Sequence, residues 1–127
     1  MISRARASGI KITRGHDIEL SIVLPCLNEE ETVGECISDC YRVLDEMGIE
    51  SEVLVVDNGS QDSSIDVIKN SRASLYIEHK KGYGSALLKG FREAAGKYII
   101  MLDCDGTYDP SQIKLVWQLL NNDYDFV

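Results

Sequence analysis

The stretch YIIMLDCDG, residues 98–106, joins an apolar run to an abrupt acidic end. Residues 98–102 are continuously apolar, as expected of a β-strand that is covered on both faces. Asp103 and Asp105 follow directly and flank a single residue. Alternate residues at the end of a strand project to the same side, so both carboxylates can reach one point. Two hard oxygen ligands predict a site for Mg²⁺ or Mn²⁺.

The same order, an apolar strand followed by a polar break and a helix, recurs along the chain. Strands are predicted at residues 20–26, 53–56 and 75–77, in addition to 98–102, and a further one begins at Phe126. Strand–helix alternation with crossovers of this length predicts an α/β fold. We expect a doubly wound, mainly parallel sheet with helices on both faces.

The helices between these strands have recognisable ends. The first is predicted to begin at Asn28, an N-cap with Glu31 at the capping-box position, and to end at Gly48. The helix over residues 85–95 is predicted to end at Gly96.

Polar and glycine-rich segments follow each predicted strand, and ligands of doubly wound sheets bind at this carboxyl edge. The four segments are residues 25–29, 57–59, 80–84 and 103–105. Neighbouring strands would bring three of them together.

Several residues at this edge have two possible roles, one structural and one in ligand binding. Asp57 either closes a turn or accepts hydrogen bonds from a nucleobase or a ribose. Glu29 either stabilises a helix N-terminus or contacts a ligand. The Gly82-Tyr83-Gly84 segment indicates close backbone approach or anion binding at a helix end, and Tyr83 itself is expected to pack.

Length and charge restrict the class of protein. The 127 residues suffice for one domain, and a net charge of −8 argues against a nucleic-acid or general anionic-membrane binder. Residues 1–17 hold four basic side chains and one acid, so we expect a flexible basic arm there. Its alternative role is peripheral association with an anionic membrane surface. We expect residues 18–127 to form the folded unit.

The cysteines indicate a reducing compartment. Cys26, Cys36, Cys40 and Cys104 show neither CxxC spacing nor nearby histidines, so we expect reduced thiols rather than a zinc site. No secretory signal or spanning apolar run is present in the sequence. The expected location is the cytoplasm, with the cytoplasmic face of a membrane as the peripheral alternative.

Four segments taken together resemble the nucleotide-sugar-binding half of a family 2 glycosyltransferase with the GT-A fold. They are residues 23–30 (VLPCLNEE), 55–62 (VVDNGSQD), 82–90 (GYGSALLKG) and 102–110 (LDCDGTYDP). The branch they resemble most loads a sugar onto a polyprenyl phosphate, as dolichyl-phosphate mannose synthase does.

The resemblance implies a role for each matching residue. The base and ribose pocket would be lined by Pro25, Leu27 and Glu29, and the base held by Val55 and Asp57. Asp103, Cys104 and Asp105 would form the Asp-x-Asp motif, with both aspartates on the metal and the diphosphate. Leu27 stands where the family usually has an aromatic residue, which argues against base stacking there.

The implied reaction is metal-dependent transfer of a hexose, with inversion, from a UDP- or GDP-linked sugar to an acceptor such as a polyprenyl phosphate. Family members continue beyond this length into an acceptor-side region. We therefore expect this chain alone to bind the donor without turnover, and we assign no catalytic residue.

Two alternatives remain open at this point. A haloacid-dehalogenase-type phosphatase would use Asp103 as nucleophile and Asp105 as acid/base. It would leave the segments 25–30 and 57–60 unexplained. A non-enzymatic nucleotide-binding module would instead oligomerise through an open sheet edge.

Overall fold

The computed structural model describes residues 2–4 and 17–121. Residues 1, 5–16 and 122–127, including the strand predicted at Phe126, lie outside the described residues. Within the described part a single sheet contains, in chain order, β1 (Ile2–Arg4), β2 (Leu20–Cys26), β3 (Ser51–Asp57), β4 (Ser74–Ile77) and β5 (Tyr98–Met101). The helices are α1 (Val33–Met47), α2 (Ser64–Lys69), α3 (Tyr83–Glu93) and α4 (Ser111–Asn121).

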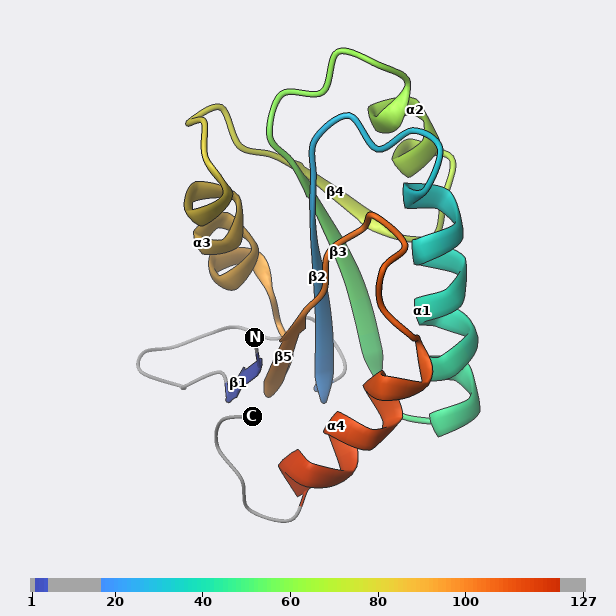
Figure 1. The fold of residues 1–127 in the computed structure, drawn as a ribbon. Helices are drawn as coiled ribbons and strands as arrows, with labels where there is room; N and C mark the ends of the chain where they lie inside the picture. Colours follow the sequence, from blue (N-terminus) through green and yellow to red (C-terminus); the bar gives the residue numbers. More distant parts are fainter. Residues whose placement is uncertain (1, 5–16, 122–127) are drawn as a thin grey trace.

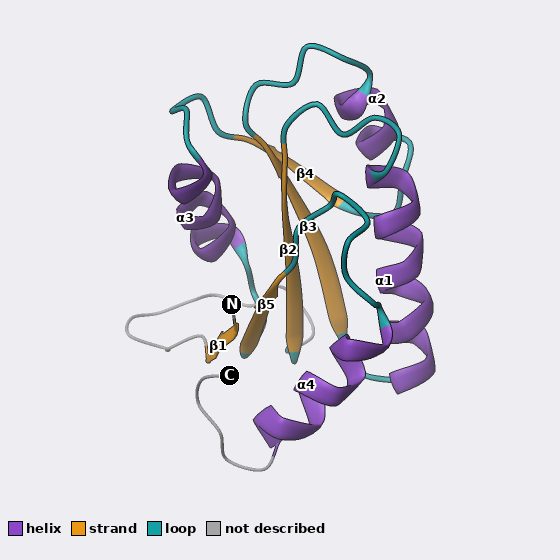
Figure 2. Cartoon of the chain, in the orientation of Figure 1, coloured by secondary structure: helices purple, strands orange, loops and turns teal. Residues whose placement is uncertain are grey.

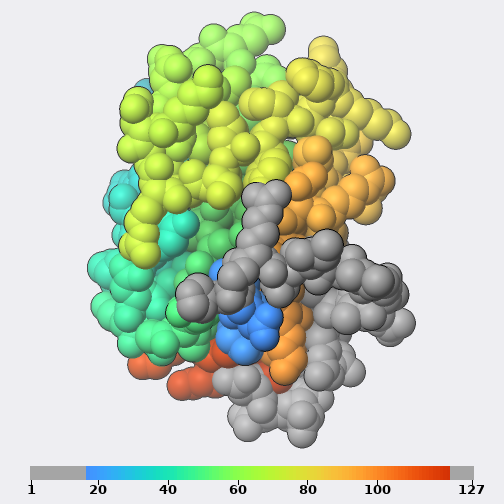
Figure 3. Space-filling view, turned by 180° about the vertical axis from the view of Figure 1, so that it is seen from behind, coloured from blue at the N-terminus to red at the C-terminus, as the bar shows by residue number. Residues whose placement is uncertain are grey.

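The sheet has the order β1-β5-β2-β3-β4. The strands β5, β2, β3 and β4 are mutually parallel, while β1 runs antiparallel to β5. Residues 2–4 of the predicted arm thus form an edge strand, and the rest of that arm is not described. At the other edge, the view from behind shows the segment around β4, yellow-green to yellow, at the surface (Figure 3).

Helices cover both faces of the sheet, as predicted. Figures 1 and 2 place α1 and α4 on one side of the strands and α3 on the other. Side chains of β2 alternate between the two layers: Ile22 and Leu24 pack in the cluster of α1, α2 and α4, and Val23 packs in the cluster of α3. All three are fully buried. The predicted double winding and the burial of the strands on both faces are confirmed.

The start of α1 differs from the prediction. The N-cap is Thr32 rather than Asn28, which has a positive φ of 53°. Asn28 instead binds the loop after β3: its N–H donates to Ser60 Oγ at 2.8 Å, and its Oδ1 accepts from the Gln61 N–H at 2.8 Å. Because these bonds to a distant loop replace the capping box, the helix begins only after the loop.

Two glycines were predicted to end helices. Gly48 does so, with a left-handed φ of 66° at the end of α1. By contrast α3 is capped by Ala94, and Gly96 serves close approach instead. A Cβ at Gly96 would lie 2.6 Å from the backbone nitrogen of Ser21, so only glycine fits between the two segments.

Candidate functional site

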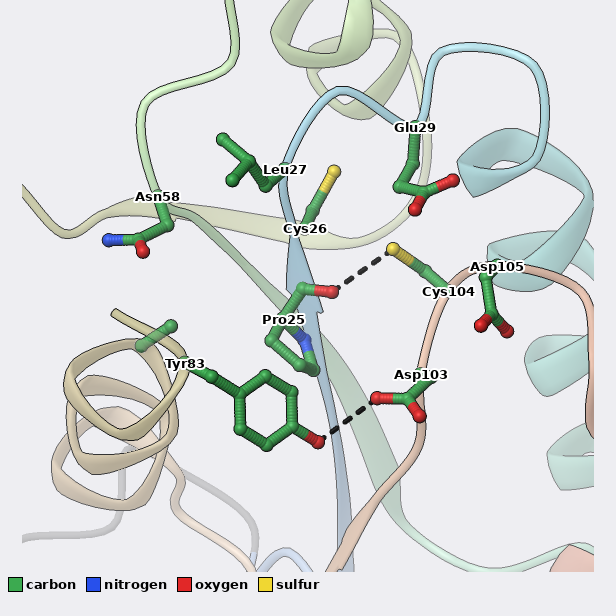
Figure 4. Close-up of a pocket in the computed structure, with 10 residues that line it drawn as sticks. Pro25, Cys26, Leu27, Glu29, Asn58, Tyr83, Asp103, Cys104 and Asp105 are labelled. Carbon is green, nitrogen blue, oxygen red and sulfur yellow. Dashed lines mark hydrogen bonds between the residues drawn. The ribbon is translucent and has the colours of Figure 1, made fainter. Parts of the chain in front are cut away.

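A cavity of about 330 Å³ opens beyond the carboxyl ends of β2 and β5. Figure 4 shows the loop after β2, the loop after β5 and the start of α3 around it. Its lining consists of Pro25, Cys26, Leu27, Glu29, Asn58, Tyr83, Ala86, Asp103, Cys104 and Asp105. The parallel pairing of β2 with both β3 and β5 explains why residues so far apart in sequence meet here.

Most of the predicted site residues line this cavity, but two do not. Val55 is fully buried in the core. Asp57 is also fully buried, and its Oδ2 accepts hydrogen bonds from the backbone N–H groups of Gly59 (3.0 Å) and Ser60 (2.8 Å). In this structure Asp57 therefore closes the turn after β3, and the base contacts of Val55 and Asp57 stay predictions.

The two aspartates of the motif are both exposed and line the same cavity. Oδ1 of Asp103 accepts a hydrogen bond from the Tyr83 hydroxyl at 3.0 Å. Oδ1 of Asp105 accepts from Thr107, from its hydroxyl at 2.6 Å and its N–H at 3.0 Å. The Thr107 hydroxyl and then its N–H lower the pKa of Asp105, so this carboxylate is ionised at neutral pH.

The two carboxylates of Asp103 and Asp105 suit a metal ion whose other ligands come from water and from the bound substrate. Among the described residues no group of three or more His, Cys, Asp and Glu side chains is placed to hold a metal ion. Asp103 and Asp105 supply carboxylate oxygens in an open cavity. Mg²⁺ and Mn²⁺ suit such a site, because one or two carboxylates with phosphate oxygens and water complete their shell.

Cys104 fixes the loop between the aspartates rather than offering a ligand. Its buried thiol donates to the Pro25 carbonyl at 3.1 Å (Figure 4). The hydrogen-bonded neighbour Cys26, together with burial, raises the pKa of Cys104, so the thiol keeps its proton. On the other side of this loop, Thr32 Oγ1 lies 2.7 Å from the Cys104 carbonyl and 3.0 Å from Glu29 Oε2.

Three site residues were missed or misread from sequence. Tyr83 was expected to pack, yet 59% of its surface is exposed and its hydroxyl reaches Asp103. Partial desolvation of the hydroxyl and its hydrogen bond to Asp103 raise the pKa of Tyr83, so the phenol stays protonated and donates. Thr107 binds Asp105 within the loop after β5, whereas Asn58 binds the loop before α3. The glycines around Tyr83 and the short spacing from Asp105 to Thr107 were usable signals, whereas the partners of Asn58 are set by the fold.

None of the helices in the described part of the chain has the length and hydropathy of a membrane span.

Comparison with known proteins gives consistent matches. The family model "Glycosyl transferase family 2" matches residues 21–127. The low-salt glycan biosynthesis hexosyltransferase Agl6 of Haloferax volcanii is 37% identical over 84% of this chain and 26% of its own length. The undecaprenyl-phosphate 4-deoxy-4-formamido-L-arabinose transferase of Edwardsiella ictaluri is 27% identical over 85% of this chain and 35% of its own length.

A solved structure supports the fold. Glucosyl-3-phosphoglycerate synthase from Mycobacterium tuberculosis, in complex with Mn²⁺, UDP and glucosyl-3-phosphoglycerate, superposes with a TM-score of 0.69 at 27% identity. The match covers 81% of this chain and 40% of that one. The chain thus spans less than half the length of each of these relatives. The fold is the GT-A fold, and the chain belongs to glycosyl transferase family 2.

Proposed function

We propose that this chain binds a nucleoside-diphosphate sugar together with a divalent cation. The observation that carries the proposal is the convergence of Asp103 and Asp105 with Pro25, Leu27 and Glu29 in one cavity. The diphosphate would lie at the aspartates and the nucleoside along the end of β2. UDP is the favoured nucleotide, because the Mycobacterium tuberculosis synthase was solved with UDP and Mn²⁺.

The reaction we propose for this site is hexosyl transfer with inversion. A phosphate oxygen of the acceptor forms a bond to the anomeric carbon from one face. The bond from that carbon to the diphosphate oxygen breaks on the other face, and its electron pair leaves with the nucleoside diphosphate. The name of the Edwardsiella ictaluri relative supports a polyprenyl phosphate as acceptor.

The residues of the chain hold the donor for this step. A bound Mg²⁺ or Mn²⁺ would neutralise charge on the leaving diphosphate. Asp103 and Asp105 would hold it, because an acidic edge on a chain of net charge −8 repels a bare diphosphate. Thr107 holds Oδ1 of Asp105, and the Cys104 bond to Pro25 fixes the loop between the aspartates.

A calorimetric titration of UDP and GDP, with Mn²⁺ or with EDTA, tests donor binding. We expect UDP to bind with Mn²⁺, and Asp105→Ala to weaken binding by at least about tenfold. Glu46→Ala is the matched control, since it removes one exposed charge on α1 outside the cavity. Equal affinities for wild type and Asp105→Ala would contradict the metal site.

Catalysis is tested separately, with a UDP-hexose donor and undecaprenyl phosphate as acceptor. We expect the 127-residue chain to bind the donor without sustained transfer. Continued release of UDP coupled to product formation would overturn that expectation and leave donor binding intact. Membrane association through the basic arm and oligomerisation through the sheet edge also stay predictions, to be checked by vesicle sedimentation and by the mass of the particle in solution.

A further inference from the structure

Tyr83 lies in a position that packing does not explain. It is the first residue of α3 and follows Gly82, whose φ is 127°. More than half of its surface is exposed, yet its hydroxyl reaches from α3 to Asp103 in the loop after β5 (Figure 4). The contact therefore ties together two segments that border the cavity from different sides of the sheet.

The two aspartates of the site are held in the same way. Thr107 binds Oδ1 of Asp105, and Tyr83 binds Oδ1 of Asp103. All three hydrogen bonds end on the Oδ1 atoms, so the Oδ2 atom of each carboxylate takes no part in them. A carboxylate that is held through one oxygen presents the other in a fixed direction, which is the usual role of the groups behind metal ligands.

The loop that carries Tyr83 is itself fixed by one side chain. The Nδ2 group of Asn58 donates to the carbonyls of Glu78 (3.0 Å) and Lys80 (2.9 Å), and its Oδ1 accepts from the Gly82 N–H at 2.9 Å. A carboxamide is needed for this, because an aspartate at the same place would have no N–H donors. Asn58 thereby ties the start of α3 to the end of β3.

We propose that Tyr83 is a positioning residue that directs the Asp103 carboxylate toward the metal and diphosphate, and that Asn58 fixes the loop from which Tyr83 reaches it. This inference rests on the proposed function, since it concerns the same cation. The inference adds Asn58, from the loop after β3, and Tyr83, from the start of α3, to the two aspartates of the loop after β5. The geometry of the metal site would then depend on the segments that follow β3, β4 and β5.

Titration with Mn²⁺ in the presence of UDP, followed by the EPR signal of free Mn²⁺, tests the proposal without any activity. Tyr83→Phe removes only the hydroxyl and is expected to raise the Kd for Mn²⁺ about tenfold. Leu88→Ala is the control, because Leu88 is 55% exposed on the same helix and does not line the cavity. It should bind Mn²⁺ as the wild type does.

A double variant tests the role of Asn58. Asn58→Ala should also weaken Mn²⁺ binding, and adding Tyr83→Phe to it should change the Kd little further. If the two substitutions raise the Kd for Mn²⁺ independently, so that their effects multiply in the double variant, Asn58 does not act through Tyr83. Urea unfolding without metal checks that each variant is folded. A folded Asn58→Ala variant that binds Mn²⁺ with wild-type affinity would also overturn the role of Asn58.

The outcomes separate this inference from the proposed function. Wild-type affinity in Tyr83→Phe, with Mn²⁺ binding lost in Asp105→Ala, overturns the role of Tyr83 and keeps the metal site. Failure of the wild type itself to bind Mn²⁺ with UDP overturns both. A Kd raised in Tyr83→Phe and unchanged in Leu88→Ala supports both.

Discussion

The carboxylate of Asp57 is fully buried at the end of β3 and still has partners for both oxygens. Besides the two N–H groups on Oδ2, the Ser60 hydroxyl donates to Oδ1 at 2.5 Å. The same hydroxyl oxygen accepts from the Asn28 N–H. The Asp57 carboxylate thus holds the loop after β3 and, through Ser60, the loop after β2. A buried polar group needs such partners, because burial without hydrogen bonds is costly.

Removal of this carboxylate should cost stability. We expect Asp57→Ala to lower the free energy of unfolding by about 2–3 kcal/mol, since the Gly59 and Ser60 donors lose their acceptor. Asp57→Asn keeps an acceptor oxygen and should cost only about 1 kcal/mol. Urea unfolding followed by circular dichroism measures both, and equal losses in the two variants would contradict the hydrogen-bond argument.

Two of the four thiols, those of Cys40 and Cys104, should be unreactive in the folded chain. Cys40 is fully buried, and burial raises its pKa to about 11; Cys104 is buried and has a raised pKa as well. Because the thiolate is the reactive form, a colourimetric thiol reagent at neutral pH should leave both unmodified until urea unfolds the chain. Peptide mapping after a short exposure checks this, and rapid labelling of Cys104 in the folded protein would contradict it.

Helix α3 packs on the sheet through a glycine. A Cβ at Gly90 would overlap a methyl group of Val23 on β2, whereas a Cβ at Gly84, earlier in the same helix, would meet nothing. The close approach of helix and strand brings the first turn of α3, with Ala86 and Tyr83, to the cavity. The helix can lie this near only because position 90 has no side chain.

Matched alanine substitutions test this packing. Gly90→Ala should lower the free energy of unfolding by about 1–3 kcal/mol through overpacking, despite the better helix propensity of alanine. Gly84→Ala should be neutral or stabilise by up to about 1 kcal/mol. In a Val23→Ala background the cost of Gly90→Ala should shrink, and an unchanged cost there would show that Val23 is not the obstacle.

Titratable groups spread over the whole molecule restrict the pH range of stability. The hydrogen bond from Arg72 lowers the pKa of Asp45, and Thr107 lowers that of Asp105, from an ordinary value of 3.8. Stability from these carboxylates is present above that value and is lost as the pH falls through their folded pKa values. Burial raises the pKa of Cys40 from 9.0 to about 11, so its contribution is lost as the pH rises from 9.0 toward 11.

We therefore expect a plateau in the free energy of unfolding between about pH 5 and pH 8, with a fall on each side. Urea unfolding across the pH range measures it. Cys40→Ala should weaken the alkaline fall and leave the acid one unchanged. Stability that rises steadily above the pKa of an ordinary thiol would contradict the assignment.

The sequence alone determined the local pattern of this protein. The apolar runs at 20–26 and 98–102, the breaks after them and the Asp103-Asp105 pair depend on neighbouring residues, and they predicted the double winding, the sheet edge and the acidic end. The stop at Gly48 was predictable for the same reason, because a left-handed glycine is a local choice.

Only the tertiary structure decided which distant groups meet. The start of α1 moved to Thr32 because Asn28 binds the loop after β3. Tyr83 reaches Asp103 because the Asn58 carboxamide fixes the loop before α3. Such hydrogen bonds join segments tens of residues apart, and their geometry exists only once parallel strands have brought the loops to one edge.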